Sequence, residues 1–133
     1  MITKNKVEIE ISTELDISNA IRDFTNALVE TAHYKKYESA SEKFQNDQEA
    51  QKALQEYRAK ARDLQTKQMF NTLSEAEQKD LQRLWIAFLA YKPVQDFFDA
   101  QGEFQSLCMA CAQVISDNCG LDYATSCGSG CCG

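Results

Sequence analysis

The residues best suited to chemistry are the six cysteines, and none of them precedes Cys108 in the 133-residue chain. They stand at Cys108, Cys111, Cys119, Cys127, Cys131 and Cys132, and four of the five glycines follow Cys119. Several soft thiolates in one short segment are typical of a metal site, a disulfide framework or a redox thiol cluster. The chemistry of this chain is therefore expected at its C-terminal end.

A metal site is the leading interpretation. Disulfide frameworks belong to secreted domains too small for a core, with bridges spread over the fold, whereas these cysteines avoid most of the chain. Residues 1–19 show no basic segment followed by an apolar one, so nothing in them directs the chain to an oxidising compartment. We expect a cytoplasmic protein.

The first two cysteines lie within an expected helix that begins at Pro93. Residues three apart on a helix have Cβ atoms about 5–6 Å apart, so Cys108 and Cys111 can bind one metal ion or one cluster. The alternative is that both are small buried apolar residues. They share an apolar stripe, which consists of Val94, Phe97, Phe104, Cys108, Cys111 and Ile115.

The other cysteines reach this pair only if the helix ends. Cys119 lies about 12 Å beyond Cys111 on a continuous helix, and the run 117–120 offers a break with Gly120 in the left-handed conformation. The tail 121–133 spans up to about 40 Å when extended, enough to return Cys127, Cys131 and Cys132 to the pair. Incidental thiols in a disordered tail are the alternative.

The spacing favours an iron–sulfur cluster over zinc slightly, because the second C-x-x-C knuckle of most zinc sites is missing. A thiol redox enzyme using Cys108 and Cys111 is the weakest alternative. Such a motif normally opens a helix, and residues 105–115 contain no Lys, Arg or His to activate a thiolate. No other catalytic constellation is visible, so we expect a protein that is not an enzyme.

The elements that must position these cysteines are helices. Ser12 or Thr13 is expected to cap a first helix, a second covers 34–44, and Asn46-Asp47 caps a third. Two apolar stripes support the first and third helices: Ile17, Ile21, Phe24 and Leu28, then Ala50, Leu54, Tyr57, Ala61 and Leu64. We predict an all-α antiparallel bundle of about four to five helices with a Cys/Gly-rich C-terminal tail.

A fourth helix is predicted from a capping box, Ser74 to Glu77, to about Tyr91. Its second half is apolar nearly all round, which indicates burial on more than one side, either in the bundle centre or in a dimer interface. Trp85 is the natural anchor of either contact.

The N-terminal residues differ from the rest. Residues 7–11 alternate apolar and charged side chains, which predicts a strand. No other segment offers it a partner strand, so it either pairs with another copy of the chain or is loose. The sequence thus predicts three parts: an arm over 1–12, a helical domain over 13–118 and a cysteine-rich tail over 119–133.

Charge and hydropathy exclude two classes of partner. The net charge is −6 and no basic cluster exceeds Lys35-Lys36, which disfavours direct nucleic-acid binding. The longest apolar run, 84–91, is well short of the roughly 20 residues that span a membrane.

The pattern of helices and breaks over 17–122 resembles the YlbF/YmcA family of small helical bacterial regulators. The similar segments are 44–57, the Gln-rich continuation to Gln68, the break at Asn71, the junction 91–94 and the helix 104–115. Family members often carry glycine where Asn71 stands, and Asn also tolerates the left-handed conformation.

The resemblance implies an all-helical protein without catalysis of its own that forms homodimers or hetero-oligomers with related regulators. Gram-positive members act in a complex that influences competence, sporulation and biofilm formation and is linked to messenger-RNA processing by a ribonuclease. Some members carry C-terminal cysteines and take part in binding [4Fe-4S] clusters. The tail from Cys127 to Cys132 resembles that type, which makes an iron–sulfur cluster the expected cofactor, with zinc as the alternative.

Overall fold

The computed structural model describes the backbone of residues 2–122 and the side chains of residues 13–122. Within this range the protein is all-α, and its elements are α1 (Ile2–Val29), α2 (Ala32–Asn46), α3 (Gln48–Asp63), α4 (Gln65–Met69), α5 (Glu75–Leu89) and α6 (Lys92–Cys119). The predicted fold class is confirmed. The chain divides into two units, Met1–Lys35 and Lys36–Gly133, which are described separately.

The strand predicted over 7–11 is wrong, because α1 is helical from Ile2 onward. For the same reason Ser12 and Thr13 do not cap the first helix. An isolated strand leaves its backbone N–H and C=O groups unpaired, whereas a helix pairs them within the segment. Without a second strand in the described residues, local alternation of side chains did not decide the backbone conformation.

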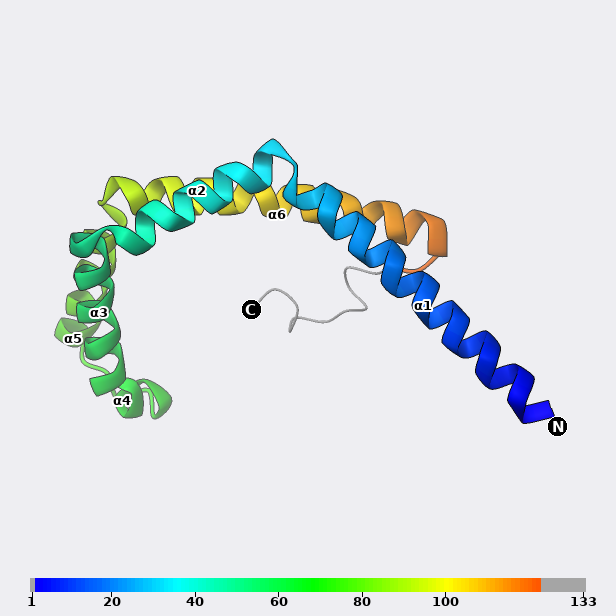
Figure 1. Ribbon diagram of the computed structural model, residues 1–133. Helices are drawn as coiled ribbons and strands as arrows, with labels where there is room; N and C mark the ends of the chain where they lie inside the picture. The colour runs from blue at the N-terminus through cyan, green and yellow to red at the C-terminus, as the bar shows by residue number, and fades with distance from the viewer. Residues whose placement is uncertain (1, 123–133) are drawn as a thin grey trace. The chain divides into compact units, whose positions relative to one another are not determined.

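In the second unit, the helices α3 and α5 lie side by side (Figure 1). Tyr57 packs on Trp85 with ring centroids 5.0 Å apart, and the Lys60 amine lies 3.4 Å from the Asp80 carboxylate. Residue numbers rise along α3 as they fall along α5, so the two helices are antiparallel. The apolar seam predicted on α3 therefore has its partner within the same chain.

The other antiparallel pair joins α2 to the first half of α6. The Tyr37 ring stacks on that of Phe104 at 5.6 Å, and the Phe44 ring stacks on that of Phe97 at 5.2 Å. Lys36 donates two hydrogen bonds to the Glu103 carboxylate, at 2.9 and 2.8 Å. Aromatic contacts of this kind hold the N-terminal half of α6 in place.

The core of this unit lies where the two helical pairs meet. Asp47 separates α2 from α3 and accepts a hydrogen bond from the Ala50 backbone N–H, which confirms the predicted cap. Tyr91 precedes α6, and Pro93 occupies its first turn, where a missing N–H costs no helical hydrogen bond. Ala50, Phe88 and Val94 are buried beside both breaks, with partly buried side chains of both helical pairs packed around them.

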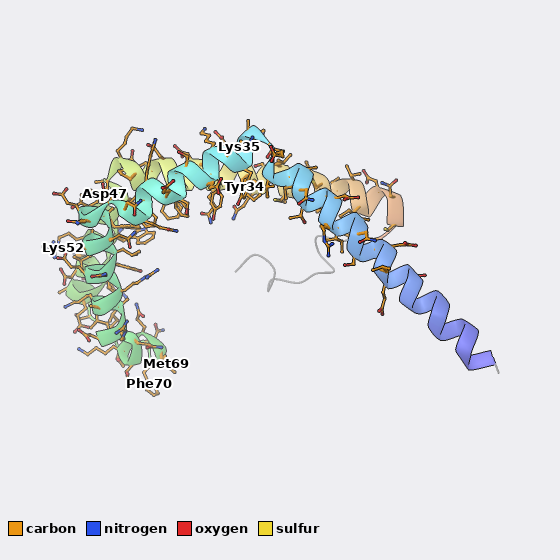
Figure 2. All side chains as sticks on the ribbon, in the orientation of Figure 1. Tyr34, Lys35, Asp47, Lys52, Met69 and Phe70 are labelled. Carbon is orange, nitrogen blue, oxygen red and sulfur yellow. The ribbon has the colours of Figure 1, made fainter. Side chains whose placement is uncertain are left out.

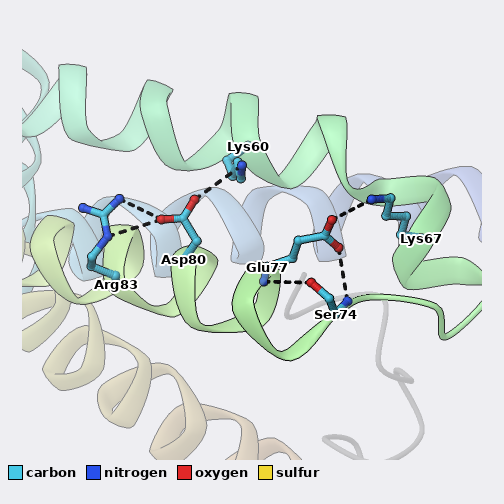
Figure 3. A network of polar contacts seen from close by, with 6 residues as sticks. All are labelled: Lys60, Lys67, Ser74, Glu77, Asp80 and Arg83. Carbon is cyan, nitrogen blue, oxygen red and sulfur yellow. Dashed lines mark hydrogen bonds and ion pairs between the residues drawn. The ribbon is translucent and has the colours of Figure 1, made fainter.

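Polar contacts that involve α3, α4, α5 and the residue before α5 stabilise the far end of the α3–α5 pair (Figure 3). Ser74 accepts a hydrogen bond from the Glu77 N–H, and the Glu77 carboxylate accepts one from the Ser74 N–H, which confirms the predicted capping box. Lys67 adds an ion pair to Glu77 at 2.6 Å. This end of the unit is thus held by caps and ion pairs.

Within the chain α5 is buried on one side, and burial of its other side in a dimer interface stays a prediction. Leu81 and Phe88 are buried, whereas Ile86 is exposed. Trp85 faces Tyr57 and Phe88 inside the chain, so it anchors an intrachain contact.

Candidate cysteine site

Cys108 and Cys111 lie in the second half of α6, which is helical without interruption to Cys119. Both thiols are free and half-buried. On a helix their Cβ atoms are about 5–6 Å apart, whereas a disulfide requires about 3.5–4.5 Å. The pair suits two thiolates on one metal group better than a disulfide within one helical turn.

The surroundings of Cys108 disfavour its thiolate form. Burial raises the pKa of the Cys108 thiol, and the neighbouring Cys111 thiolate raises it further. A raised pKa lowers the fraction of thiolate, which is the nucleophilic form. This arrangement is the opposite of that in thiol redox enzymes, where a helix N-terminus or a cation lowers the pKa.

Cys119 does not join this pair through the local backbone. The predicted break exists, because Gly120 has φ 69° and its N–H donates to the Ser116 carbonyl at 2.9 Å. It falls one residue after Cys119, however, so Cys119 stays on the helix, about 12 Å along the axis from Cys111. Cys119 is also exposed.

The other predicted ligands, Cys127, Cys131 and Cys132, lie outside the described residues. Among residues 13–122, no group of three or more His, Cys, Asp or Glu side chains is arranged to hold a metal ion. The described donor set therefore fits a soft metal group only in part, because one helical turn offers two thiolates.

The apolar stripe predicted on α6 needs one correction. Val94 is buried, and Phe97, Phe104, Cys108 and Cys111 are half-buried, but Ile115 is exposed. The buried position nearby is Ser116, whose hydroxyl donates to the Ala112 carbonyl at 3.0 Å. That hydrogen bond satisfies the hydroxyl within the helix, so a serine can occupy this buried position.

Sequence reasoning missed an apolar surface at the end of the α3–α5 pair. Met69 and Phe70 are 76% and 71% exposed (Figure 2). Asn71 follows them with φ 56°, and the Thr72 N–H donates to the Lys67 carbonyl at 2.9 Å. The sequence could have indicated this exposure, because two large apolar residues directly precede a break and connecting segments usually run over the protein surface.

The surface between α2 and α6 offers little to a small molecule. A depression of about 240 Å³ is lined by Lys36, Ser39, Ala40, Lys43, Asp96 and Asp99. Its two lysines and two aspartates balance in charge. A second depression of about 600 Å³ shares Ser39 and Lys43 with it and is also lined mostly by polar side chains, whereas ligand pockets are mostly apolar.

Together, the helical pairs, the exposed apolar side chains and the thiol pair define a small all-helical protein whose distinctive groups lie at its surface. Residues 17–118 match the family described as control of competence regulator ComK, YlbF/YmcA, and the chain belongs to this family. Neither curated proteins nor solved structures gave a match. None of the described helices is long and apolar enough to cross a membrane.

Proposed function

We propose that this chain is a non-catalytic cytoplasmic regulator that acts through protein complexes, and that its C-terminal cysteines bind an iron–sulfur cluster. The family match over residues 17–118 is the observation that supports a regulatory role. Regulation of this kind requires surfaces for other proteins, and several large apolar side chains are exposed on the described helices.

Cys108 and Cys111 are the cluster ligands that the helix geometry supports best. They present two thiolates from one turn, and their spacing disfavours a disulfide between them. The remaining ligands would come from Cys119, Cys127, Cys131 and Cys132, with Cys119 the least suited because α6 holds it away from the pair. Zinc at the same cysteines, or no metal at all, is the alternative.

A bound iron–sulfur cluster would supply one-electron redox chemistry and sensitivity to iron supply. The chain's own contribution would be to hold the first two thiolates on a rigid helix. That helix is tied at Phe97 and Phe104 to α2, so a change at the cysteines would act on the same element that builds the core. Partner binding would then depend on the state of the cysteines. A related regulator, or a ribonuclease as in Gram-positive members of the family, is the partner we propose.

A thiol redox enzyme is disfavoured by the raised pKa of Cys108. Disulfide turnover needs a thiolate that forms near neutral pH, and the described residues around this pair place no cation against it.

The test is anaerobic purification of the untagged full chain, followed by iron, zinc and acid-labile sulfide analysis and a visible spectrum. We expect stoichiometric iron and sulfide with thiolate-to-iron absorbance. Cys111→Ser should abolish the absorbance, whereas Cys119→Ser, a matched loss of one thiol, should retain most of it. Zinc alone, or no metal with six titratable thiols, would refute the cluster and leave a helical interaction protein.

A further inference from the structure

A continuous series of aromatic rings runs through α3, α5, α2 and α6, and all of its members belong to the second unit. Each ring centroid lies 5.0–5.9 Å from the next, a distance at which aromatic rings attract each other. We call this series the aromatic ladder. In order of contact, its rings are those of Tyr57, Trp85, Phe88, Phe44, Phe97, Tyr37 and Phe104.

The aromatic ladder ends one helical turn before the cysteine pair. Phe104 lies four residues before Cys108 on α6, and side chains with this spacing are neighbours on one face of a helix. Both side chains are half-buried. A group that binds or joins the Cys108 sulfur must therefore be accommodated beside the Phe104 ring.

We propose that the aromatic ladder transmits the state of Cys108 to the α3–α5 pair. A group on the Cys108 sulfur displaces the Phe104 ring, and the displacement passes through Tyr37 and then Phe97. From there it reaches the core and the indole of Trp85. Packed rings transmit a displacement because a close-packed interior leaves little space in which one ring can move alone.

This inference deepens the proposed function. It rests on the claim of that function that the cysteines change state, but it does not depend on which group they bind. The proposed function makes partner binding depend on the cysteines, and the aromatic ladder extends their influence from α6 to the α3–α5 pair.

Tyr37 is the relay on which this coupling depends. Its ring lies 5.6 Å from that of Phe104 and 5.8 Å from that of Phe97, so it bridges two residues of α6. Cys108 lies roughly 16 Å beyond Phe97 along the helix axis. Changes at sites more than about 7–10 Å apart usually have independent effects when the sites share no partner. Without the aromatic ladder, a change at Cys108 should therefore leave Trp85 unaffected.

The only tryptophan of the chain, Trp85, gives a direct readout. Fluorotryptophan incorporated into the full chain places one fluorine there, and its NMR resonance reports on the packing of the indole. The chain to be tested keeps Cys108 and has serine at the other cysteine positions. Methyl methanethiosulfonate converts the Cys108 thiol into its methyl disulfide and releases methanesulfinate, and a thiol reductant reverses the change. We expect the resonance to shift on modification and to return on reduction.

Two controls separate the aromatic ladder from general effects. A chain that keeps Cys119 alone carries the same modification at an exposed position farther along α6, and its resonance should stay unchanged. Phe98→Leu, made in the Cys108 chain, removes a ring that contacts Phe97 but is not part of the aromatic ladder, and the shift should persist.

The relay is tested in the same Cys108 chain. Tyr37→Leu breaks the aromatic ladder and should abolish the shift, whereas Tyr37→Phe keeps the ring and should preserve it. Phe104→Leu removes the last ring and should also abolish the shift, so it provides the same test if Tyr37→Leu does not fold. Circular dichroism verifies that each variant is helical.

Three outcomes would overturn the inference. An unmoved resonance after complete modification of Cys108, verified by mass, means that the aromatic ladder does not transmit the change. An equal shift in the Cys119 chain means that the effect is not specific to the ladder. A shift that persists in folded Tyr37→Leu or Phe104→Leu means that another route carries it.

Iron and sulfide analysis of the wild-type chain tests the proposed function separately. A Trp85 shift in the Cys108 chain, together with a wild type that binds no cluster, would uphold this inference and refute the proposed cluster alone. A wild type that binds a cluster, with no Trp85 shift on modification of Cys108, would refute this inference alone.

Discussion

The Tyr57 ring packs against the indole of Trp85 with centroids 5.0 Å apart, and this contact joins α3 to α5 within one chain. Aromatic pairs add about 0.5–1.5 kcal/mol beyond their burial of area. In a double-mutant cycle of Tyr57→Leu and Trp85→Leu, we expect a coupling energy of that size. Urea unfolding followed by circular dichroism measures it, since Trp85 fluorescence is lost in two of the variants. Additive effects would mean that the rings stabilise the protein independently.

Phe88 is 2% exposed and touches aromatic residues of both helical pairs. Replacing it with alanine leaves a cavity between the pairs, so Phe88→Ala should lower the free energy of unfolding by about 3–5 kcal/mol. Phe70→Ala is the matched control. Because Phe70 is largely exposed, its truncation should change stability by less than about 0.5 kcal/mol. Similar losses in both variants would place the core elsewhere.

The cap at Ser74 offers a second stability test. Ser74→Ala removes the side-chain acceptor of the Glu77 N–H and should cost about 1 kcal/mol in thermal or urea unfolding. Ser106→Ala removes an exposed serine from the middle of α6 and should be neutral or slightly stabilising, because alanine favours helix more than serine does. A cap variant as stable as the wild type would show that water replaces the serine at no cost.

Two carboxylates should make stability sensitive to acid. The hydrogen bond from Lys67 and the Ser74 N–H lower the pKa of Glu77, and hydrogen bonds from Arg83 and Lys60 lower the pKa of Asp80. A folded-state pKa below the unfolded value means that the stabilisation is present above the unfolded pKa and is lost as pH falls through the folded pKa.

Unfolding midpoints measured from pH 7 downward should therefore fall below about pH 4, where carboxylates of unfolded chains take up protons. Glu77→Gln and Asp80→Asn together should flatten this dependence while lowering stability slightly at pH 7. Added salt should reduce the difference, since these pairs are exposed and screened. An unchanged acid profile in the double variant would assign the dependence to other groups.

Local signals predicted most of the fold. The Asp47 cap, the Ser74 capping box, Pro93 in the first turn of α6 and Gly120 at its end each have a mechanism that acts within a few residues. The partner of the α3 seam could not be predicted, because periodicity shows that a face is buried without showing what covers it.

The errors arose where local pattern and context disagree. Residues 7–11 alternate like a strand but had no strand to pair with, and α1 is helical there. Ile115 fits the periodicity of the buried stripe on α6, yet Ser116 holds the buried position. In the candidate site, the spacing correctly predicted that Cys108 and Cys111 lie on one helical turn. Whether Cys119 could turn towards them depended on whether the helix ended before or after it, and the sequence pattern did not locate the helix end to a single residue.

The hydrogen bonds from Lys36 to Glu103 join residues 67 positions apart in the chain. Closing so long a loop costs conformational entropy, and contacts of high sequence separation slow folding. The α3–α5 hairpin needs no such closure, since its two helices follow each other across a short connection. Once it forms, the end of α2 and the start of α6 emerge at the same place, and their pairing becomes local. We therefore expect the hairpin to fold first and the helix that carries the cysteines to be ordered last.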